Sequence, residues 1–439
     1  PKTPERFFIN SLITNTVVEK MFSFASYLQE DAQGKNLHLE HLEDEILNFG
    51  IGGARGAINF LQALRDMLSG NDRSSINMTV KWDGAPAIFA GVDPSDGKFF
   101  VAKKSVFNKT PLLYKTRKEI NDDPKLPQAL KPAFLVALEE FGKLGIKGVL
   151  QGDLMFTSSS LETEMIDGQR FTTFQPNTIV YAVPRYSDLD RQIRSAKIGV
   201  VWHTTYSGQT LEKMSASFGA NISGLRKNKA VWMDDATYRD ESGTATFTKA
   251  ETNVVTGHLA TAGRLFQRIK KTELDAMLRL QRQLESQGKT AGATLKTYAN
   301  SKVRAGEKIT NVTAYVNGYE KWVSDKFDVQ TQKLKQEKSK KENERKKQEV
   351  LREVKKYRNL LINVISFQNA LVDAKMVIVR KLNTIKQMMD TFVRTKQGFK
   401  VTNPEGYVAI DRVGGNAVKL VDRMEFSYNN FTAIKAWDR

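Results

Sequence analysis

The order of hydrophobic patterns along the chain is the strongest constraint on how it can fold. Short β-rich runs separated by turn signals occupy residues 76–205. Apolar residues then recur at steps of three and four over residues 256–400, which is the helical period. Strand character returns after residue 401, on either side of the hairpin-turn sequence Gly414-Gly415-Asn416. A strand-rich unit that is interrupted by helices and then resumes is discontinuous, so its two parts must meet in space.

These patterns predict a mixed α+β fold in four segments. The N-terminal region carries apolar stripes at helical spacing over Leu37–Leu47 and Ala57–Leu68, with glycines between them. The glycines do not match a dinucleotide-binding loop, because Arg55 stands where the third glycine is required and the preceding element is a helix. We therefore expect a turn between helices. The segments are an N-terminal helical region (1–75), the first part of a strand-rich core (76–255), a basic helical insertion (256–400) and the last strands of the core (401–439).

The chain is strongly basic. It has 67 Lys and Arg against 49 Asp and Glu in 439 residues, a net charge of +18. Such a surplus repels itself unless a polyanion or counterions screen it, which favours a nucleic-acid or other phosphate-rich partner. The segment Lys326–Arg358 alone has 13 Lys and Arg against 6 Asp and Glu. It predicts a long solvated helix, either one arm of a helical hairpin or coiled coil or simply a soluble helix face.

Composition excludes several kinds of site. The chain has no cysteine, which rules out disulfides, Cys-ligated zinc, iron–sulfur clusters and thiol catalysis. His38 and His41 lack a third ligand at helical spacing, so they are interpreted as surface residues. We see no run of about 18 apolar residues and no secretory signal. A cytoplasmic protein is expected, or a virus-encoded one located in host cytoplasm or virion.

The sequence Lys81-Trp82-Asp83-Gly84 at the end of a predicted strand is the sharpest local feature. A lysine acts as a nucleophile when it is partly deprotonated, and burial and neighbouring cations both lower a lysine pKa. Asp83 and Gly84 allow a tight turn and place a carboxylate beside the amine. Alone, these four residues would usually be an exposed strand end.

Four further segments follow in order and add chemistry to this lysine. They supply acids, a second lysine and an aromatic ring. In nucleotidyl transfer, acids hold a divalent metal and the ribose, a second cation neutralises charge on the α-phosphate, and an aromatic face stacks on the base. The segments are Gln151-Gly152-Asp153-Leu154, Ile179–Val183 around Tyr181, Glu405-Gly406-Tyr407-Val408, and Val418-Lys419-Leu420 with Arg423 and Glu425-Phe426-Ser427 after it.

The five segments and their order resemble the covalent nucleotidyltransferases, namely ATP-dependent DNA ligases, RNA ligases and mRNA capping enzymes. The ending, where Lys419 is followed by Phe426-Ser427, is most similar to RNA ligases of phage type. The resemblance covers residues 76–205 and 401–427 and implies the mixed-sheet adenylation-domain fold of ligases. Few residues follow the last motif, so we expect the C-terminal OB-fold of DNA ligases and capping enzymes to be missing.

The resemblance implies a role for each matched residue. The catalytic residues are Lys81, which would become adenylylated, Asp83, and Lys419, which would contact the α-phosphate. The residues that bind ATP and Mg²⁺ or Mn²⁺ are Asp153 for the ribose and metal, Tyr181 for adenine, Glu405 for the metal, Lys104 or its neighbours Lys103 and Ser105 for phosphate, and Arg423.

Some positions depart from the family pattern. Asp153 replaces a glutamate, and Val421 stands where a second lysine is expected, with Arg423 as a substitute on the same strand face. Val80 precedes the lysine where many relatives have a polar residue, which leaves the base open. The implied function is an ATP-dependent polynucleotide ligase acting on RNA more than DNA. The alternatives are a non-catalytic phage structural or nucleic-acid-binding protein on a degenerate scaffold, and nucleotidyl transfer to another acceptor.

Overall fold

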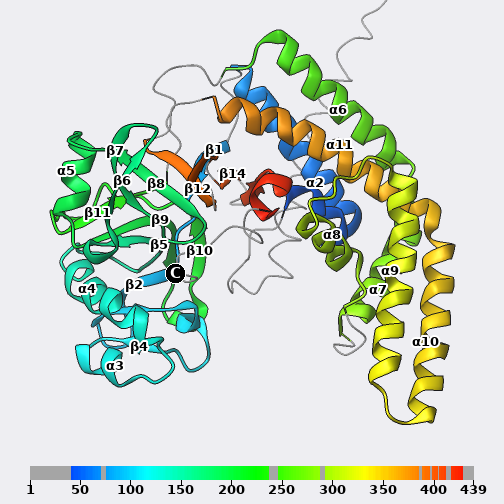
Figure 1. Cartoon of the computed structure of the whole chain (residues 1–439), viewed down its shortest axis with the longest axis horizontal. Coiled ribbons are helices and arrows are strands. Elements are labelled where there is room, and N and C mark those ends of the chain that lie inside the picture. The colour runs from blue at the N-terminus through cyan, green and yellow to red at the C-terminus, as the bar shows by residue number, and fades with distance from the viewer. Residues whose placement is uncertain are drawn as a thin grey trace, which may run out of the picture.

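The fold is mixed α and β, as predicted. A computed structural model of the chain describes residues 41–70, 76–236, 246–286, 292–384, 388–395, 398–403, 405–411 and 417–428. Within them, a strand-rich body and a body of long helices lie on opposite sides of the molecule, with a small sheet between them (Figure 1).

The largest sheet forms the centre of the strand-rich body. Its strands run in the order β10-β9-β5-β2-β3-β4, with β11 also paired to β9. Phe134 and Phe141 on α4 (Lys131–Phe141) are fully buried in one hydrophobic core with Trp202 of the sheet. The strands are β2 (Ala87–Val92), β3 (Phe99–Ala102), β4 (Leu113–Tyr114), β5 (Val149–Thr157), β9 (Ile198–Ser207), β10 (Ser215–Phe218) and β11 (Val231–Asp234), and α3 (Arg117–Asp122) and α5 (Asp188–Ser195) are the other helices of this body.

A second sheet, in the order β13-β12-β8-β7-β6, joins parts of the chain that lie on either side of the helices. Strand β12 follows the last long helix and pairs antiparallel with β8, with Phe392 opposite Val180. The helical segment therefore leaves the sheet and returns to it. The strands are β6 (Glu162–Ile166), β7 (Gln169–Phe174), β8 (Ile179–Pro184), β12 (Asp390–Thr395) and β13 (Gly398–Val401).

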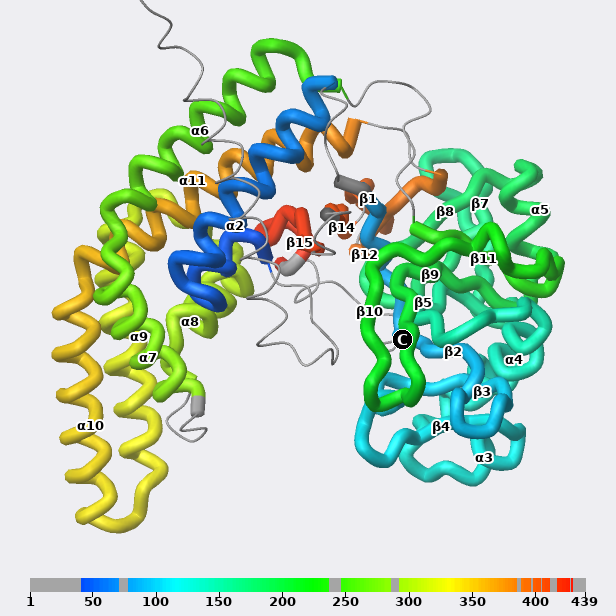
Figure 2. Tube along the Cα trace, turned by 180° about the vertical axis from the view of Figure 1, so that it is seen from behind, coloured from blue at the N-terminus to red at the C-terminus, as the bar shows by residue number. Residues whose placement is uncertain are grey.

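The small sheet between the two bodies confirms that the strand-rich unit is discontinuous (Figure 2). Strand β14 (Gly406–Asp411) lies in the middle and pairs antiparallel with β1 (Ile76–Lys81) and with β15 (Ala417–Leu420). The predicted hairpin is formed by β14 and β15, and its turn lies outside the described residues. An isolated bridge joins His41 to Lys419 and so attaches the start of the helical body to the last strand.

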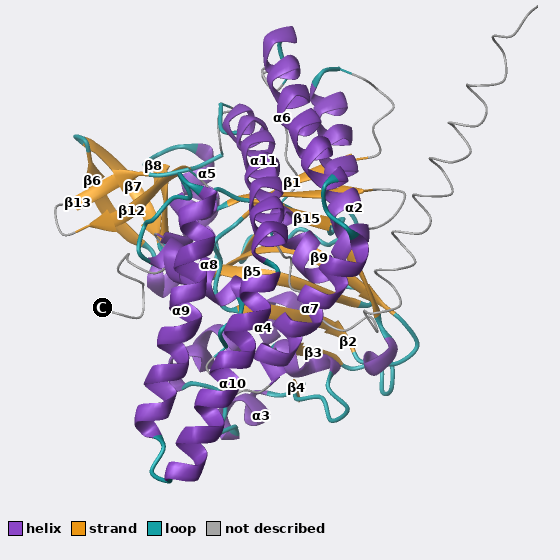
Figure 3. Cartoon of the chain, turned by 90° about the vertical axis from the view of Figure 1, so that its right-hand side faces the viewer, coloured by secondary structure: helices purple, strands orange, loops and turns teal. Residues whose placement is uncertain are grey.

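Seven long helices make the other body within the described residues. Helix α11 (Arg358–Leu382) packs along α6 (Lys249–Gln267) and also contacts α2 (Glu45–Leu68) and α9 (Val312–Lys333). Helix α10 (Glu337–Lys356) lies along α9 (Figure 3), so Lys326–Arg358 is not the single long helix predicted but is divided at residues 334–336 and contributes to both arms of a helical hairpin. The remaining two are α7 (Lys271–Ser286) and α8 (Leu295–Arg304).

Helix α11 is long and apolar enough, by length and composition alone, to cross a membrane. Half of its most apolar window is buried inside the fold. Its Lys375 is 1% exposed and pairs with Glu43 of the short helix η1 (Leu42–Asp44), at 2.7 Å. Burial of one apolar face against neighbouring helices is the arrangement of a core helix.

Several predicted boundaries are wrong. The predicted break between two N-terminal helices is present at Gly50 inside α2, where φ is 60° and ψ is −137°, but residues 51–56 are helical, so the second helix starts before the predicted Ala57. The inserted helices begin at Lys249 and end at Leu382, so β12 and most of β13 fall within the segment predicted as helical. These two strands are short, and the pairing of β12 with β8 and with β13, rather than local pattern, makes them strands.

Candidate active site

The ends of the small sheet bring three predicted residues together. Lys81, at the end of β1, donates a hydrogen bond to Glu405, directly before β14. The Nζ atom of Lys419 on β15 lies 3.4 Å from the other carboxylate oxygen of Glu405. Glu405 is only 5% exposed, so a buried carboxylate is shared by two ammonium groups.

Gly406 makes this approach possible. It lies opposite Lys81 in the ladder and has a φ of +148°. A Cβ at this position would stand 2.5 Å from the carbonyl oxygen of Leu420. Only glycine combines this backbone conformation with such close strand contact, which is the physical reason for a Glu-Gly pair here.

The charges around Lys81 act against the predicted activation of its amine. Burial lowers the pKa of Lys81, but the carboxylates of Glu405, Asp153 and Asp83 raise it more, so that the pKa lies above its usual value. The prediction of a lowered pKa for this lysine is therefore wrong, because three carboxylates lie close enough to outweigh the effect of burial. The pKa of Lys419 is lowered instead, mainly by burial, with Lys81 and Lys375 adding to the effect.

Asp83 fixes the loop before β8. Its carboxylate accepts hydrogen bonds from the backbone N–H groups of Thr178 and Ile179 at 2.7 and 2.8 Å, and from the Asn177 amide at 2.7 Å. Burial and the charge of Glu405 raise its pKa to about 6. These contacts place Asp83 as a support that orients the turn after Lys81.

Gly84 and Asp153 are packed against each other. A Cβ on Gly84 would stand 2.4 Å from Cβ of Asp153 on β5. Asp153 in turn lies 3.7 Å from Nε2 of His203 and contributes to the raised pKa of Lys81. The glycine thus lets the β1 turn approach the strand that carries the second predicted acid.

Tyr181 lies beside the site, but its ring is buried under other aromatic side chains. It is 2% exposed, its ring stacks with Trp82 at 5.1 Å and with Phe174 at 5.4 Å, and its hydroxyl accepts a hydrogen bond from the Asp83 N–H. A small hollow that is open to solvent lies next to it. The hollow is lined by Val80, Lys81, Trp82, Tyr181, Met388, Met389 and Thr391.

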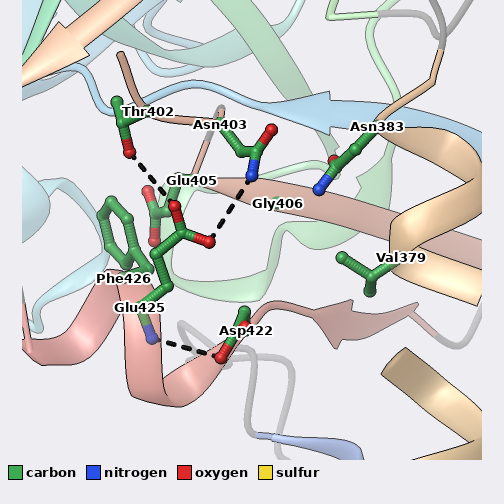
Figure 4. A pocket seen from close by; sticks show the side chains of 9 residues that line it. All are labelled: Val379, Asn383, Thr402, Asn403, Glu405, Gly406, Asp422, Glu425 and Phe426. Atoms are coloured by element: carbon green, nitrogen blue, oxygen red, sulfur yellow. Dashed lines mark hydrogen bonds between the residues drawn. The ribbon is translucent and has the colours of Figure 1, made fainter. Parts of the chain in front are cut away.

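A second pocket, of about 290 Å³, borders Glu405 (Figure 4). The end of α11, the loop before β14 and the short helix η6 (Arg423–Ser427) contribute its side chains. Asp422 caps η6 by accepting hydrogen bonds from the N–H groups of Met424 and Glu425. The lining residues are Val379, Asn383, Thr402, Asn403, Glu405, Gly406, Asp422, Glu425 and Phe426.

The predicted metal does not fit the acids as they stand. Both oxygens of Glu405 face lysine ammonium groups. Across the part of the chain that the structure describes, no group of three or more His, Asp or Glu side chains is placed to hold a metal ion. We therefore derive no step through a metal.

The two remaining predicted residues are Lys104 and Arg423. Lys104 is exposed at the start of the short helix η2 (Lys104–Phe107), which follows β3 at the same end of the sheet as Asp153. Arg423 does not lie on the strand, because β15 ends at Leu420. Its guanidinium binds Asp44 at 3.1 Å and Asn300 at 2.7 Å, so the prediction that it replaces a lysine on the strand face is wrong.

The charged segment that precedes α2 was not predicted from the sequence. Glu43 pairs with Lys375, and Gln368 donates hydrogen bonds to the Glu43 carbonyl and to Asp44. His41, predicted to be a surface residue, has a side chain only 15% exposed, and burial lowers its pKa. His38 lies outside the described residues. No local pattern marks these contacts, since their partners are more than three hundred positions away.

Comparison with known proteins links the sequence to one family. The sequence profile of a family of unknown function (DUF6267) matches residues 36–435. No curated protein and no solved structure matches the chain.

Proposed function

The chain belongs to this family of unknown function, DUF6267, and from its site we propose that it is an ATP-dependent polynucleotide ligase that acts through a covalent lysine–AMP intermediate. The observation that carries the proposal is the convergence of Lys81, Glu405 and Lys419 at one end of a three-stranded sheet. The order of the five motifs supports it, as does the net charge of +18. We propose RNA rather than DNA as the substrate, because the end of the sequence resembles RNA ligases.

The proposed reaction has three steps that begin at Lys81. Its neutral amine attacks the α-phosphorus of ATP, an N–P bond forms, and pyrophosphate leaves. Glu405, which already accepts a hydrogen bond from this amine, is placed to take the proton. Lys419 supplies positive charge next to the same atoms. The AMP is then transferred to a 5′-phosphate end, and a 3′-hydroxyl displaces it to seal the strand.

Labelling with α-³²P-ATP in the presence of Mg²⁺ tests the first step. The wild-type chain should form an acid-stable radioactive adduct, and Lys81→Ala should form none. Lys98→Ala is the matched control, because Lys98 is exposed in a turn of the strand-rich body and should leave labelling unchanged. An unlabelled wild-type chain would contradict the proposal.

A specific observation favours the non-catalytic alternative. Aromatic rings already stack on Tyr181, and Glu405 already accepts a hydrogen bond from the amine of Lys81. The hollow beside Tyr181 is small for a nucleotide. A scaffold that has lost nucleotide binding would have these features. Calorimetric titration with ATP, together with sedimentation, distinguishes the ligase from the non-catalytic protein. A large stable oligomer that does not bind ATP would support a structural role. Competition between RNA, DNA and protein acceptors for labelled AMP would identify transfer to another acceptor.

A further inference from the structure

The positive charge of this chain is concentrated in its helical body. Residues 249–382, which span α6 to α11, have 29 Lys and Arg against 14 Asp and Glu, a net charge of +15 out of +18 for the whole chain. The rest of the sequence is therefore close to neutral. A polyanion would be attracted to the helices rather than to the strand-rich body.

Within this body, α10 carries cations that the fold leaves unpaired. Lys338, Lys341 and Arg352 are exposed, and the structure shows no ion pair for any of them among the described residues. Their spacing of three and then eleven residues puts them on one side of a helix. Other cations of α10 form ion pairs with carboxylates, namely Lys340, Arg345, Lys347, Lys355 and Lys356.

The opposite side of α10 packs against α9. Asn343 is buried there and donates a hydrogen bond to the carbonyl oxygen of Phe327 at 3.1 Å. Val354 is also buried. The unpaired cations therefore face away from the partner helix, along a rod that projects from the helical body (Figure 3).

No aromatic side chain in the described residues of α6 to α11 is largely exposed to solvent. Among these described residues, the large hydrophobic side chains that are exposed are Val254 and Val329. Tyr298, Tyr315 and Tyr319 are buried against one another. Proteins that bind single strands obtain much of their affinity from base stacking, whereas a duplex presents phosphates at high density and hides its bases.

We propose that this face of α10 binds the phosphate backbone of a nucleic-acid duplex without sequence preference. The 20 residues of α10 span roughly 30 Å, the length of about nine base pairs. Helix α11 follows directly, and Val379 and Asn383 at its far end line the pocket beside Glu405. The inference rests on the proposed function in taking the substrate to be a polynucleotide, and it adds that the strand to be sealed is held in a duplex.

Fluorescence anisotropy with a labelled 20-base-pair RNA duplex, in EDTA and without ATP, tests this inference. The full-length triple variant Lys338→Gln/Lys341→Gln/Arg352→Gln should raise Kd at least tenfold at 100 mM salt. It should also reduce the slope of log K against log salt by roughly 3, because each lost phosphate contact removes about 0.9. The matched control is Lys98→Gln/Lys147→Gln/Lys229→Gln, which removes the same charge from exposed positions of the strand-rich body and should change Kd less than twofold.

Two results would overturn the inference. One is duplex binding by the α10 variant equal to that of the wild type, and the other is binding of the component single strand as tight as that of the duplex. Lys81→Ala should bind the duplex normally. A wild-type chain that binds the duplex but forms no labelled adduct would therefore contradict only the proposed enzymatic function. A wild-type chain that is labelled, with no effect of the α10 substitutions on Kd, would contradict only this inference.

Discussion

Lys81 donates a hydrogen bond to Glu405 across 324 positions of sequence. The contact depends on β1 and β14 pairing in a register that sets Lys81 opposite Gly406. Buried ion pairs often contribute little to net stability, because desolvation of both charges opposes their attraction. We therefore interpret the pair, with Lys419 on the other oxygen, as an arrangement that positions an amine.

Glu405→Gln should lower the pKa of Lys81. Glu405 is the main group that raises this pKa, and removal of an opposite charge at this range shifts a pKa by about 1–3 units. Titration of the lysine ε-carbons by NMR, with Lys81→Arg used to assign the signal, measures the shift. An unchanged pKa would show that the pair does not persist in solution.

The rate of adduct formation should rise with pH. Since the pKa of Lys81 is raised above its usual value, the amine is almost entirely protonated near neutral pH. The neutral fraction grows about tenfold per pH unit below the pKa, so single-turnover labelling should accelerate by roughly that factor from pH 7 to pH 8. A rate independent of pH in this range would argue against Lys81 as the group that loses a proton.

Asp83 should make the folded state less stable as pH rises. Its pKa is raised to about 6 in the folded chain, so the group favours folding when it is protonated below its unfolded pKa. That contribution, about 3 kcal/mol, is lost as pH rises through 6. Because Asp83→Asn cannot titrate, the stability of the wild type relative to this variant should fall between pH 4 and pH 7 in urea unfolding. A constant difference would contradict the raised pKa.

Lys375→Met should destabilise the chain by about 3–5 kcal/mol, because it leaves Glu43 charged and buried without a partner. The double variant Glu43→Leu/Lys375→Met removes both charges and should recover most of the loss. Denaturant unfolding of both variants measures the difference. A double variant no more stable than the single one would show that packing, not the uncompensated charge, causes the effect.

Gly84→Ala should disturb the site, because its new Cβ would stand 2.4 Å from Cβ of Asp153. Overpacking of this kind costs about 1–3 kcal/mol, and the turn after Lys81 should shift as well. Gly224→Ala is the control, since no heavy atom lies within 4 Å of the added Cβ. We expect reduced thermal stability and reduced labelling for the first variant only, and equal behaviour of the two would be evidence against the close packing.

Local patterns determined most of the elements. Strand β2 lies among the β-rich runs predicted over residues 76–205, and its turn-flanked apolar run suffices to define it. The β14–β15 hairpin was predicted for the same reason, and the basic segment Lys326–Arg358 was correctly predicted as helical but without its break between α9 and α10. Strands β12 and β13 were missed, because they exist through pairing with β8 and with each other.

The sequence by itself determined the periodicity, the interruption of the strand-rich unit and the excess of positive charge, since each depends only on neighbouring residues or on counting. Only the tertiary structure decided the surroundings of the charged groups. It set three carboxylates close to Lys81, turned Arg423 toward Asp44 and buried His41. A pKa and an ion pair depend on which distant segments exclude water from one another, and a linear pattern does not contain that information.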